Sequence, residues 1–170
     1  MSTFTVATFN ANSIRSRLPV VLDWLEARRP DVLAIQETKV QDSDFPAAAI
    51  REAGYHAVFA GEKSYNGVAL LSREPPEDVR HGFDDGGPAD ATRLIAARFG
   101  AVHVVNTYVP QGRDLAHEMY AYKLKWFGRL QKFFGRHFRP DQPLLWVGDL
   151  NVAPTPLDVH NPADHEDHVC

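Results

Sequence analysis

Oxygen-bearing side chains follow three of the apolar, strand-like segments of this sequence. Asn10 ends the first segment, Glu37 ends the second, and Asp149 and Asn151 follow the last. Ligands of α/β folds collect where strands end, and two residues that are two positions apart on an extended chain point to one face. Carboxylates and amides without Cys or Met favour a hard cation such as Mg²⁺, which completes its shell with water and substrate phosphate. The pattern therefore indicates metal-assisted phosphoryl chemistry. Asn and Asp are also common in turns, so turn caps and solvated strand ends are the alternative interpretation.

The elements that position these residues alternate between strand and helix. Apolar runs and turn signals predict strands at 4–9, 32–35, 55–60, 67–72, 94–99, 102–109 and 143–152, and helices at 14–29, 45–53 and 117–138. Residues 74–91 contain several Pro and Gly residues and are predicted to form a loop, and the strand at 143–152 is predicted to be buried. Pro19 is expected to be tolerated only in the first turn of its helix. The alternation indicates a layered α/β fold.

Composition limits the class of protein. The 170 residues, 44% hydrophobic and 24% charged, are typical of one globular domain over 1–170. No apolar run approaches the roughly 20 residues that cross a bilayer, so no membrane association is expected. The N-terminus lacks the pattern of a secretion signal, and the single cysteine, Cys170, fits a reducing compartment, which together favour the cytoplasm. A net charge of −4 excludes a protein that coats nucleic acid by bulk charge.

One longer segment carries a family signature. Residues 30–39, with the sequence PDVLAIQETK, resemble the first signature of the exonuclease III type of AP endonuclease, in the endonuclease/exonuclease/phosphatase superfamily. Further matches follow in the family's order at 9–10, 66–72, 106–112 and 148–154, and they span nearly the whole chain. The resemblance implies a four-layer α/β/β/α sandwich and hydrolysis of DNA phosphodiester bonds in base-excision repair, by incision at abasic sites or trimming of 3′ ends.

The resemblance also implies a role for individual residues. Glu37 would hold Mg²⁺, or Mn²⁺ in its place, with Asn10 as a ligand or as a partner of the ligands. Tyr108 and Asn151 would contact the scissile phosphate, and Asp149 would position or deprotonate the attacking water. A strand tyrosine is more often part of the core, so packing is the alternative for Tyr108.

Two basic residues complete the predicted site. Arg93 lies where the family has an arginine that contacts DNA phosphate, and Lys39 would add positive potential. The alternatives are a solvated strand arginine and a lysine paired with a neighbouring acid. The predicted substrate is double-stranded DNA with abasic sites or 3′ ends, and no protein partner is indicated.

The helix predicted at 117–138 has a basic stripe opposite its aromatic side. Such charges normally face water, although contact with a DNA backbone is the alternative. Lys123 falls on the aromatic side, where we expect its long side chain to reach past the aromatic residues to solvent; an ammonium directed at a phosphate site is the alternative.

The sequence departs from the family pattern on its C-terminal side. The family's Asn-x-Gly-x-Arg-x-Asp segment, the aromatic residues of its abasic-sugar pocket and its Ser-Asp-His segment have no counterpart in 1–170. The resemblance thus implies a sandwich that is incomplete at its C-terminus, with unpaired strand edges. Because loss of the family's His and its orienting Asp removes transition-state stabilisation, we expect the isolated chain to be inactive or nearly so.

Two other functions compete with the nuclease. One is a phosphodiesterase or phosphatase of the same superfamily that acts on lipid or inositol phosphates, although residues 36–39 and 108–112 argue against it. The other is a non-catalytic nucleic-acid-binding remnant, which a steep salt dependence of DNA affinity would reveal.

Overall fold

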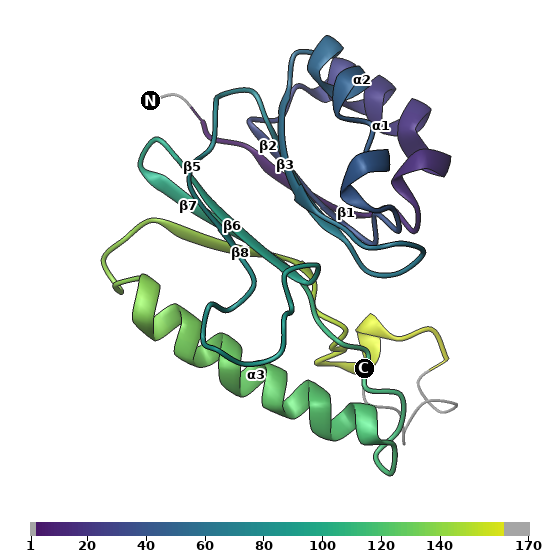
Figure 1. Ribbon diagram of the computed structural model, residues 1–170, viewed down its shortest axis with the longest axis vertical. Helices are drawn as coiled ribbons and strands as arrows, with labels where there is room; N and C mark the ends of the chain where they lie inside the picture. Colours follow the sequence, from purple (N-terminus) through teal and green to yellow (C-terminus); the bar gives the residue numbers. More distant parts are fainter. Residues whose placement is uncertain (1–2, 162–170) are drawn as a thin grey trace. The chain divides into compact units, whose positions relative to one another are not determined.

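The computed structural model (Figure 1) describes residues 3–161. These residues divide into two compact units. Within the described part of the chain, the first unit contains residues 3–108 and 139–149 and includes every strand. The second contains residues 109–138 and 150–161. Cys170 lies outside the described residues. The prediction of a single domain over 1–170 stays a prediction.

The strands of the first unit form two four-stranded sheets. The first sheet has the order β1-β2-β4-β3, with β1 (Val6–Asn10), β2 (Val32–Gln36), β3 (His56–Ala60) and β4 (Val68–Ser72). The second has the order β5-β6-β7-β8, with β5 (Glu77–His81), β6 (Leu94–Phe99), β7 (Val102–Tyr108) and β8 (Leu144–Asp149). β1 pairs with β2 in parallel and β7 with β8 in parallel, and the other pairs are antiparallel. Each sheet therefore has one parallel pair that includes an edge strand.

The two sheets pack face to face through apolar side chains. This inter-sheet core contains Val32, Ala34, Val68, Leu70, Ile95, Ala97, Phe99 and Val104. The other face of the first sheet is covered by helices α1 (Ile14–Arg28) and α2 (Ala47–Glu52), and Figure 1 shows both on that side. The first unit is thus a helix/sheet/sheet arrangement. Alternation explains it, since successive residues of β2 point to opposite faces of the sheet and both faces are covered.

Three local predictions for the first unit were wrong. Residues 77–81 form strand β5 rather than a loop. Backbone pairing with β6 and ion pairs from Arg98 to Glu77 and Asp78 hold this edge strand in place. Its residues are mostly exposed and polar, so the sequence shows no apolar alternation there. The predicted last strand is not fully buried, since Leu145 and Trp146 of β8 are about 40% exposed at the sheet edge.

The third error concerns Pro19, which lies within the second turn of α1 rather than the first. Proline cannot donate to the carbonyl four residues earlier. Both Pro19 and Arg15, whose carbonyl loses that donor, are exposed, so water can satisfy the carbonyl.

The second unit contains helix α3 (Glu118–His137), whose N-terminus is capped by the His117 ring, which accepts from the Met119 N–H at 3.1 Å. Trp126, Leu130 and Phe133 are buried, as the aromatic periodicity predicted. Lys123 is also buried, at 3% exposure, so the prediction that it reaches solvent was wrong. Among residues 3–161, no helix has the length and apolar character required to cross a membrane.

Candidate active site

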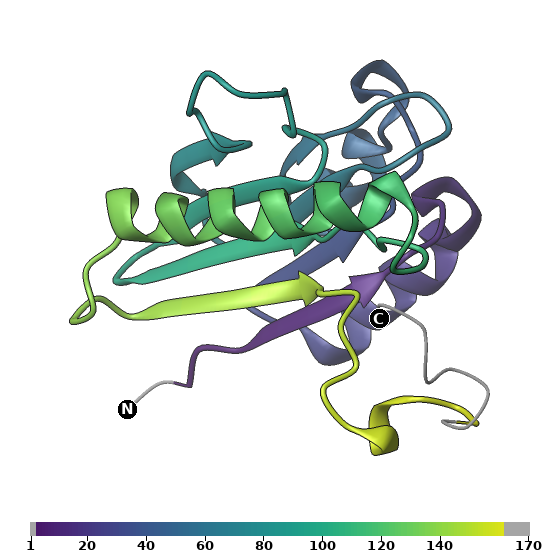
Figure 2. The same cartoon turned by 90° about the horizontal axis from the view of Figure 1, so that it is seen from below.

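Three of the predicted residues meet at the carboxyl ends of two neighbouring edge strands. β1 and β8 lie side by side and end close together, one from each sheet (Figure 2). Asn10, at the end of β1, donates from Nδ2 to Glu37 Oε1 and to Asp149 Oδ2, each at 2.8 Å. One amide group therefore bridges two carboxylates whose positions are 112 residues apart in the chain.

Glu37 is held by an unusual backbone conformation. Its φ is +50°, in the left-handed region that non-glycine residues seldom adopt. The segment after β1 runs alongside, with the Ser13 N–H donating to the Glu37 carbonyl at 2.8 Å and the Ile14 N–H to that of Thr38 at 3.0 Å. These bonds fix the chain where β2 ends, so the carboxylate of Glu37 turns toward Asn10. Strained residues that neighbouring structure holds in place are typical of functional sites.

Asp149 depends on a glycine before it. Gly148 has φ +133°, and a Cβ built on it would lie 2.0 Å from the Thr107 carbonyl oxygen. Only a residue without a side chain allows β8 to approach β7 so closely at this point. The resulting register places Asp149 opposite Tyr108.

Tyr108 packs in the core and also contacts a residue of the predicted site. Its ring packs against the inter-sheet core, and its hydroxyl shares a hydrogen bond with Glu37. Burial raises the pKa of Tyr108 to about 12, helped by the negative charges of Glu37 and Asp149 and against the opposing effect of Arg93. The hydroxyl is therefore neutral at physiological pH and can donate a hydrogen bond.

Arg93 contacts Tyr108 in two ways. Its guanidinium lies 4.8 Å from the centre of the tyrosine ring, and its Nη1 donates to the Tyr108 carbonyl at 3.2 Å. Cation–π contact and hydrogen bond together fix the end of β7. The half-buried arginine thus lies beside the predicted catalytic tyrosine.

Lys39 pairs with Glu37, with Nζ 2.8 Å from Oε2, and also donates to Asn12 Oδ1 at 2.5 Å. Burial opposes ionisation of Glu37, but the hydrogen bonds from Asn10 and Lys39, the charge of Lys39 and the bond to Tyr108 together lower its pKa below the ordinary value. Glu37 is therefore ionised at neutral pH. The ammonium of Lys39 lies beside the Glu37 carboxylate, which agrees with the alternative of a lysine paired with a neighbouring acid.

Asn151 belongs to the second unit. Its Nδ2 donates to the Val109 carbonyl at 2.8 Å, and its own carbonyl accepts from Lys123 Nζ at 2.5 Å. Lys123 Nζ also donates to the Gln111 carbonyl at 3.2 Å. The buried lysine therefore joins α3 to the segments that contain Gln111 and Asn151. Convergence of Asn151 with the other site residues stays a prediction.

The donor set of the first unit suits Mg²⁺. Two carboxylates, Glu37 and Asp149, share one amide, and no group of three or more His, Cys, Asp or Glu side chains suited to a metal occurs within residues 3–161. Mg²⁺ is usually bound by one or two carboxylates and keeps water and substrate oxygens as its other ligands. Asn10 fits the role of a partner better than that of a ligand, because its NH₂ group faces the carboxylates and its Oδ1 accepts from the Asn12 N–H at 3.0 Å.

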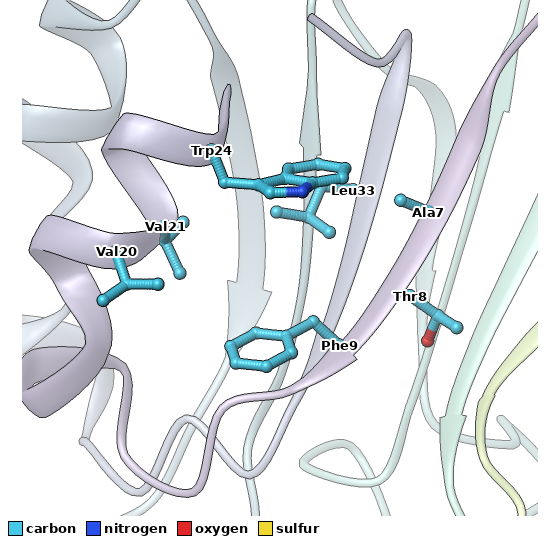
Figure 3. A pocket seen from close by; sticks show the side chains of 7 residues that line it. All are labelled: Ala7, Thr8, Phe9, Val20, Val21, Trp24 and Leu33. Atoms are coloured by element: carbon cyan, nitrogen blue, oxygen red, sulfur yellow. The ribbon is translucent and has the colours of Figure 1, made fainter. Parts of the chain in front are cut away.

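An apolar pocket lies on the other face of the first sheet. Its lining is Ala7, Thr8, Phe9, Val20, Val21, Trp24 and Leu33, from α1, β1 and β2. Figure 3 shows Phe9 turned toward α1 and Thr8 turned to the other side of β1. No carboxylate lines the pocket, so it does not belong to the metal chemistry proposed from the sequence.

Sequence reasoning missed a buried polar pair next to the site. Gln36 and Asn106 are 1% and 0% exposed, and Gln36 Nε2 donates to Asn106 Oδ1 at 2.6 Å. The sequence signal was present, because Asn106 occupies an inward position in the alternation Val104, Asn106, Tyr108.

Comparisons with known proteins bear on this site. The model of the "Endonuclease/Exonuclease/phosphatase family" matches residues 7–169. The chain belongs to this family. It is 36% identical to "Exodeoxyribonuclease III" of Haemophilus influenzae over 157 residues, which are 89% of this chain and 59% of that protein. The resemblance to exonuclease III type enzymes is thereby confirmed.

Solved structures of family members show the same fold. An AP endonuclease from Archaeoglobus fulgidus has a TM-score of 0.94 and 48% identity over 99% of this chain and 65% of its own. A 3′ phosphatase from Neisseria, bound to product DNA hairpin, has a TM-score of 0.91 and 37% identity over 99% of this chain and 66% of its own. These matches confirm the predicted layered α/β fold class. The chain spans less than two thirds of the length of each of these three relatives.

Proposed function

We propose that this family member hydrolyses phosphodiester bonds of double-stranded DNA in base-excision repair, with Mg²⁺ as cofactor and Mn²⁺ as a substitute. Its substrates would be abasic sites and 3′ ends. The proposal depends mainly on the Asn10 amide that joins the Glu37 and Asp149 carboxylates where β1 and β8 end. Its match to exodeoxyribonuclease III and to an AP endonuclease supports DNA as the substrate class. A cytoplasmic location is part of the same proposal.

Each side chain of the cluster would have a separate task. Glu37 and Asp149 supply negative oxygen, and Glu37 is the proposed ligand of the cation. The neutral Tyr108 hydroxyl would donate to a phosphate oxygen, as Asn151 would from the second unit. Asp149 would orient the attacking water or accept its proton, because it is the second carboxylate of the cluster.

Positive groups would bind the substrate. Arg93 and Lys39 are proposed to interact with DNA phosphates, in addition to their contacts with Tyr108 and Glu37. The bound cation would neutralise charge that develops on the phosphate oxygens during hydrolysis. Asn10, which donates to both carboxylates, would keep them in place whether or not a substrate is present.

The first test measures cation binding by the 170-residue chain itself. Isothermal titration with Mn²⁺ is expected to show one site, which Glu37→Gln removes. The matched control is Glu77→Gln, which changes an exposed carboxylate of β5. Equal Mn²⁺ affinity of the parent chain and Glu37→Gln would contradict the proposed cation site.

The second test measures the reaction. We expect the isolated chain to be inactive or nearly so, and residues 1–170 are therefore also joined to the part of the Archaeoglobus AP endonuclease that this chain does not span. The chimera is expected to cut an abasic-site duplex with Mg²⁺ and not with EDTA. A folded chimera that leaves the abasic-site duplex, 3′ ends and 3′-phosphate ends intact would refute the nuclease proposal. Release of phosphate alone would instead favour a phosphatase.

A further inference from the structure

The side chains that face the space between the two sheets change from apolar to polar along β2 and β7. Inward-facing residues recur at every second position, and at the start of the strands they are apolar: Val32 and Ala34 on β2, and Val104 on β7. Two residues further along β2 is Gln36, and two residues further along β7 is Asn106. These two amides form a polar layer on β2 and β7, between Ala34 and Val104 and the carboxylates of Glu37 and Asp149; beside them on the adjacent strands are the apolar Val68 and Ile95.

The amides of this layer are connected across the sheets. Gln36 Nε2 donates to Asn106 Oδ1 at 2.6 Å and to Thr8 Oγ1 at 3.0 Å. Asn106 Nδ2 donates to the carbonyls of Ile35 and Ala69, each at 2.9 Å. The side chain of β7 therefore binds the backbone of both central strands of the opposite sheet, and both amide NH₂ groups use their two donors.

Such a layer gives directional contact where apolar packing gives none. Hydrophobic attraction is roughly proportional to buried area and does not fix how two flat faces slide. Buried hydrogen bonds have narrow geometric limits, and burying an amide without them is costly. Catalytic groups must be held within roughly 0.5 Å of their working positions. The pair lies immediately before the site, since Gln36 precedes Glu37 and Asn106 is two residues before Tyr108.

We propose that Gln36 and Asn106 are a positioning pair that fixes the register of the two sheets and so holds Asn10 and Glu37 of one sheet opposite Asp149 of the other. This inference rests on the proposed function, because it assigns the pair to the same cation site. Neither amide needs to touch the cation or the DNA. Their effect is exerted through the strands that end in the site residues.

The test replaces both amides by apolar side chains of similar size, Gln36→Met with Asn106→Leu. Asn106→Leu alone leaves the buried Gln36 amide without its acceptor, whereas the double change removes both partners of that hydrogen bond. The double variant is therefore expected to be more stable to heat than Asn106→Leu. Its Mn²⁺ affinity is nevertheless expected to fall about tenfold or more, as when outer-shell partners of metal ligands are changed.

A matched control separates positioning from general stability. Val104→Ala removes apolar volume from the same inter-sheet space without changing a hydrogen bond. It is expected to lower the thermal midpoint and to keep the Mn²⁺ affinity within about twofold, because apolar packing supplies stability rather than direction. If the amides contributed only to stability, the double variant and Val104→Ala would lose Mn²⁺ affinity in the same proportion to their loss of thermal stability.

A second measurement follows the site without added metal. Asn10 bridges the carboxylates, so its side-chain N–H signals in ¹⁵N-edited NMR spectra report their spacing. These signals are expected to shift in the double variant and to stay in place in Val104→Ala. Thr8→Val, which removes one acceptor of Gln36 at the partly buried rim, serves if the double variant does not fold, and a smaller shift and affinity loss are expected.

The outcomes distinguish the two proposals. If the parent chain and Glu37→Gln bind Mn²⁺ equally, the proposed cation site is wrong. The positioning pair is then tested only by the Asn10 side-chain N–H signals. If the parent binds through Glu37 but the folded amide variant keeps both its Mn²⁺ affinity and its Asn10 signals, the positioning pair is wrong and the proposed function stands. Unchanged affinity and signals in Thr8→Val, where only that variant folds, overturn the pair as well.

Discussion

The two ends of the space between the sheets differ although the same strands form both. At one end Val32, Leu70 and Val104 are fully buried and pack without polar contact between their side chains. At the other end Asn10 joins the carboxylates of Glu37 and Asp149. Packing at the apolar end stabilises the fold and tolerates small displacements of the side chains. The hydrogen bonds at the polar end require defined distances and angles. Changes at the two ends are therefore expected to affect different measurements.

The largest effect is expected for Glu37→Gln at the polar end. Loss of the charged oxygen is expected to lower Mg²⁺-dependent incision by the chimera about 10³-fold, since a catalytic cation contributes several kcal/mol. Stability is expected to change little, because the amide keeps most of the side chain's shape. Steady-state incision rates of the variant and of Glu77→Gln give the comparison. A loss below tenfold would show that the polar end does not carry the chemistry.

Leu70→Ala makes the opposite change at the apolar end. Leu70 is fully buried in the inter-sheet core, and removing its branched side chain is expected to cost about 3 kcal/mol of unfolding free energy. Mn²⁺ affinity at a temperature where the variant is folded is expected to match that of the parent chain. Urea unfolding and isothermal titration measure the two quantities. A large loss of affinity here would mean that the two ends are not separable.

Tyr108 belongs to both ends, since its ring packs in the core and its hydroxyl bonds to Glu37. Tyr108→Phe keeps the ring, so stability is expected to stay within about 1 kcal/mol while incision falls about tenfold through the lost donor. Because the pKa of Tyr108 is about 12, the ratio of parent to variant rates is expected to be constant from pH 6 to pH 9. A ratio that changes over this range would contradict a neutral hydroxyl donor.

The smallest effect is expected for Lys39→Met. The ammonium of Lys39 lies 2.8 Å from Glu37 Oε2, so its removal is expected to strengthen Mn²⁺ binding about threefold, within the range of partly exposed ion pairs. DNA affinity is expected to fall, because a positive charge near the phosphates is lost. Fluorescence anisotropy with labelled duplex and titration with Mn²⁺ separate the two. Weaker binding of both Mn²⁺ and DNA by Lys39→Met would indicate that Lys39 holds the Glu37 side chain in position.

The sequence predicted most of the buried elements, because their apolar periodicity is a local property. β2 and β4 are buried on both faces and read as continuous apolar runs. β5 could not be found in this way, since only its pairing with β6 makes it a strand. The exposure of Trp146 depends on β8 being an edge, which is a property of the neighbours rather than of the segment.

Part of the candidate site could be predicted from the sequence. The type and position of Asn10, Glu37 and Asp149 indicated an oxygen-rich cluster, and the structure brings these three together. The bridging role of the Asn10 amide, the contact of Arg93 with Tyr108 and the bonds of Lys123 could not be predicted, because each depends on a rotamer or on a backbone carbonyl from a distant segment. Gln36 and Asn106 are different, since inward amides in otherwise apolar alternations are visible before the structure is known.

The amide of Asn10 has a consequence for how a cation arrives. Two like charges brought together would normally repel each other, but here a hydrogen-bond donor already lies between the two carboxylates. The two carboxylates are consequently held together before any cation arrives, and binding at the proposed site would need little rearrangement. Metal loading and folding would then be separate events, unlike in small zinc domains that fold only around their ion.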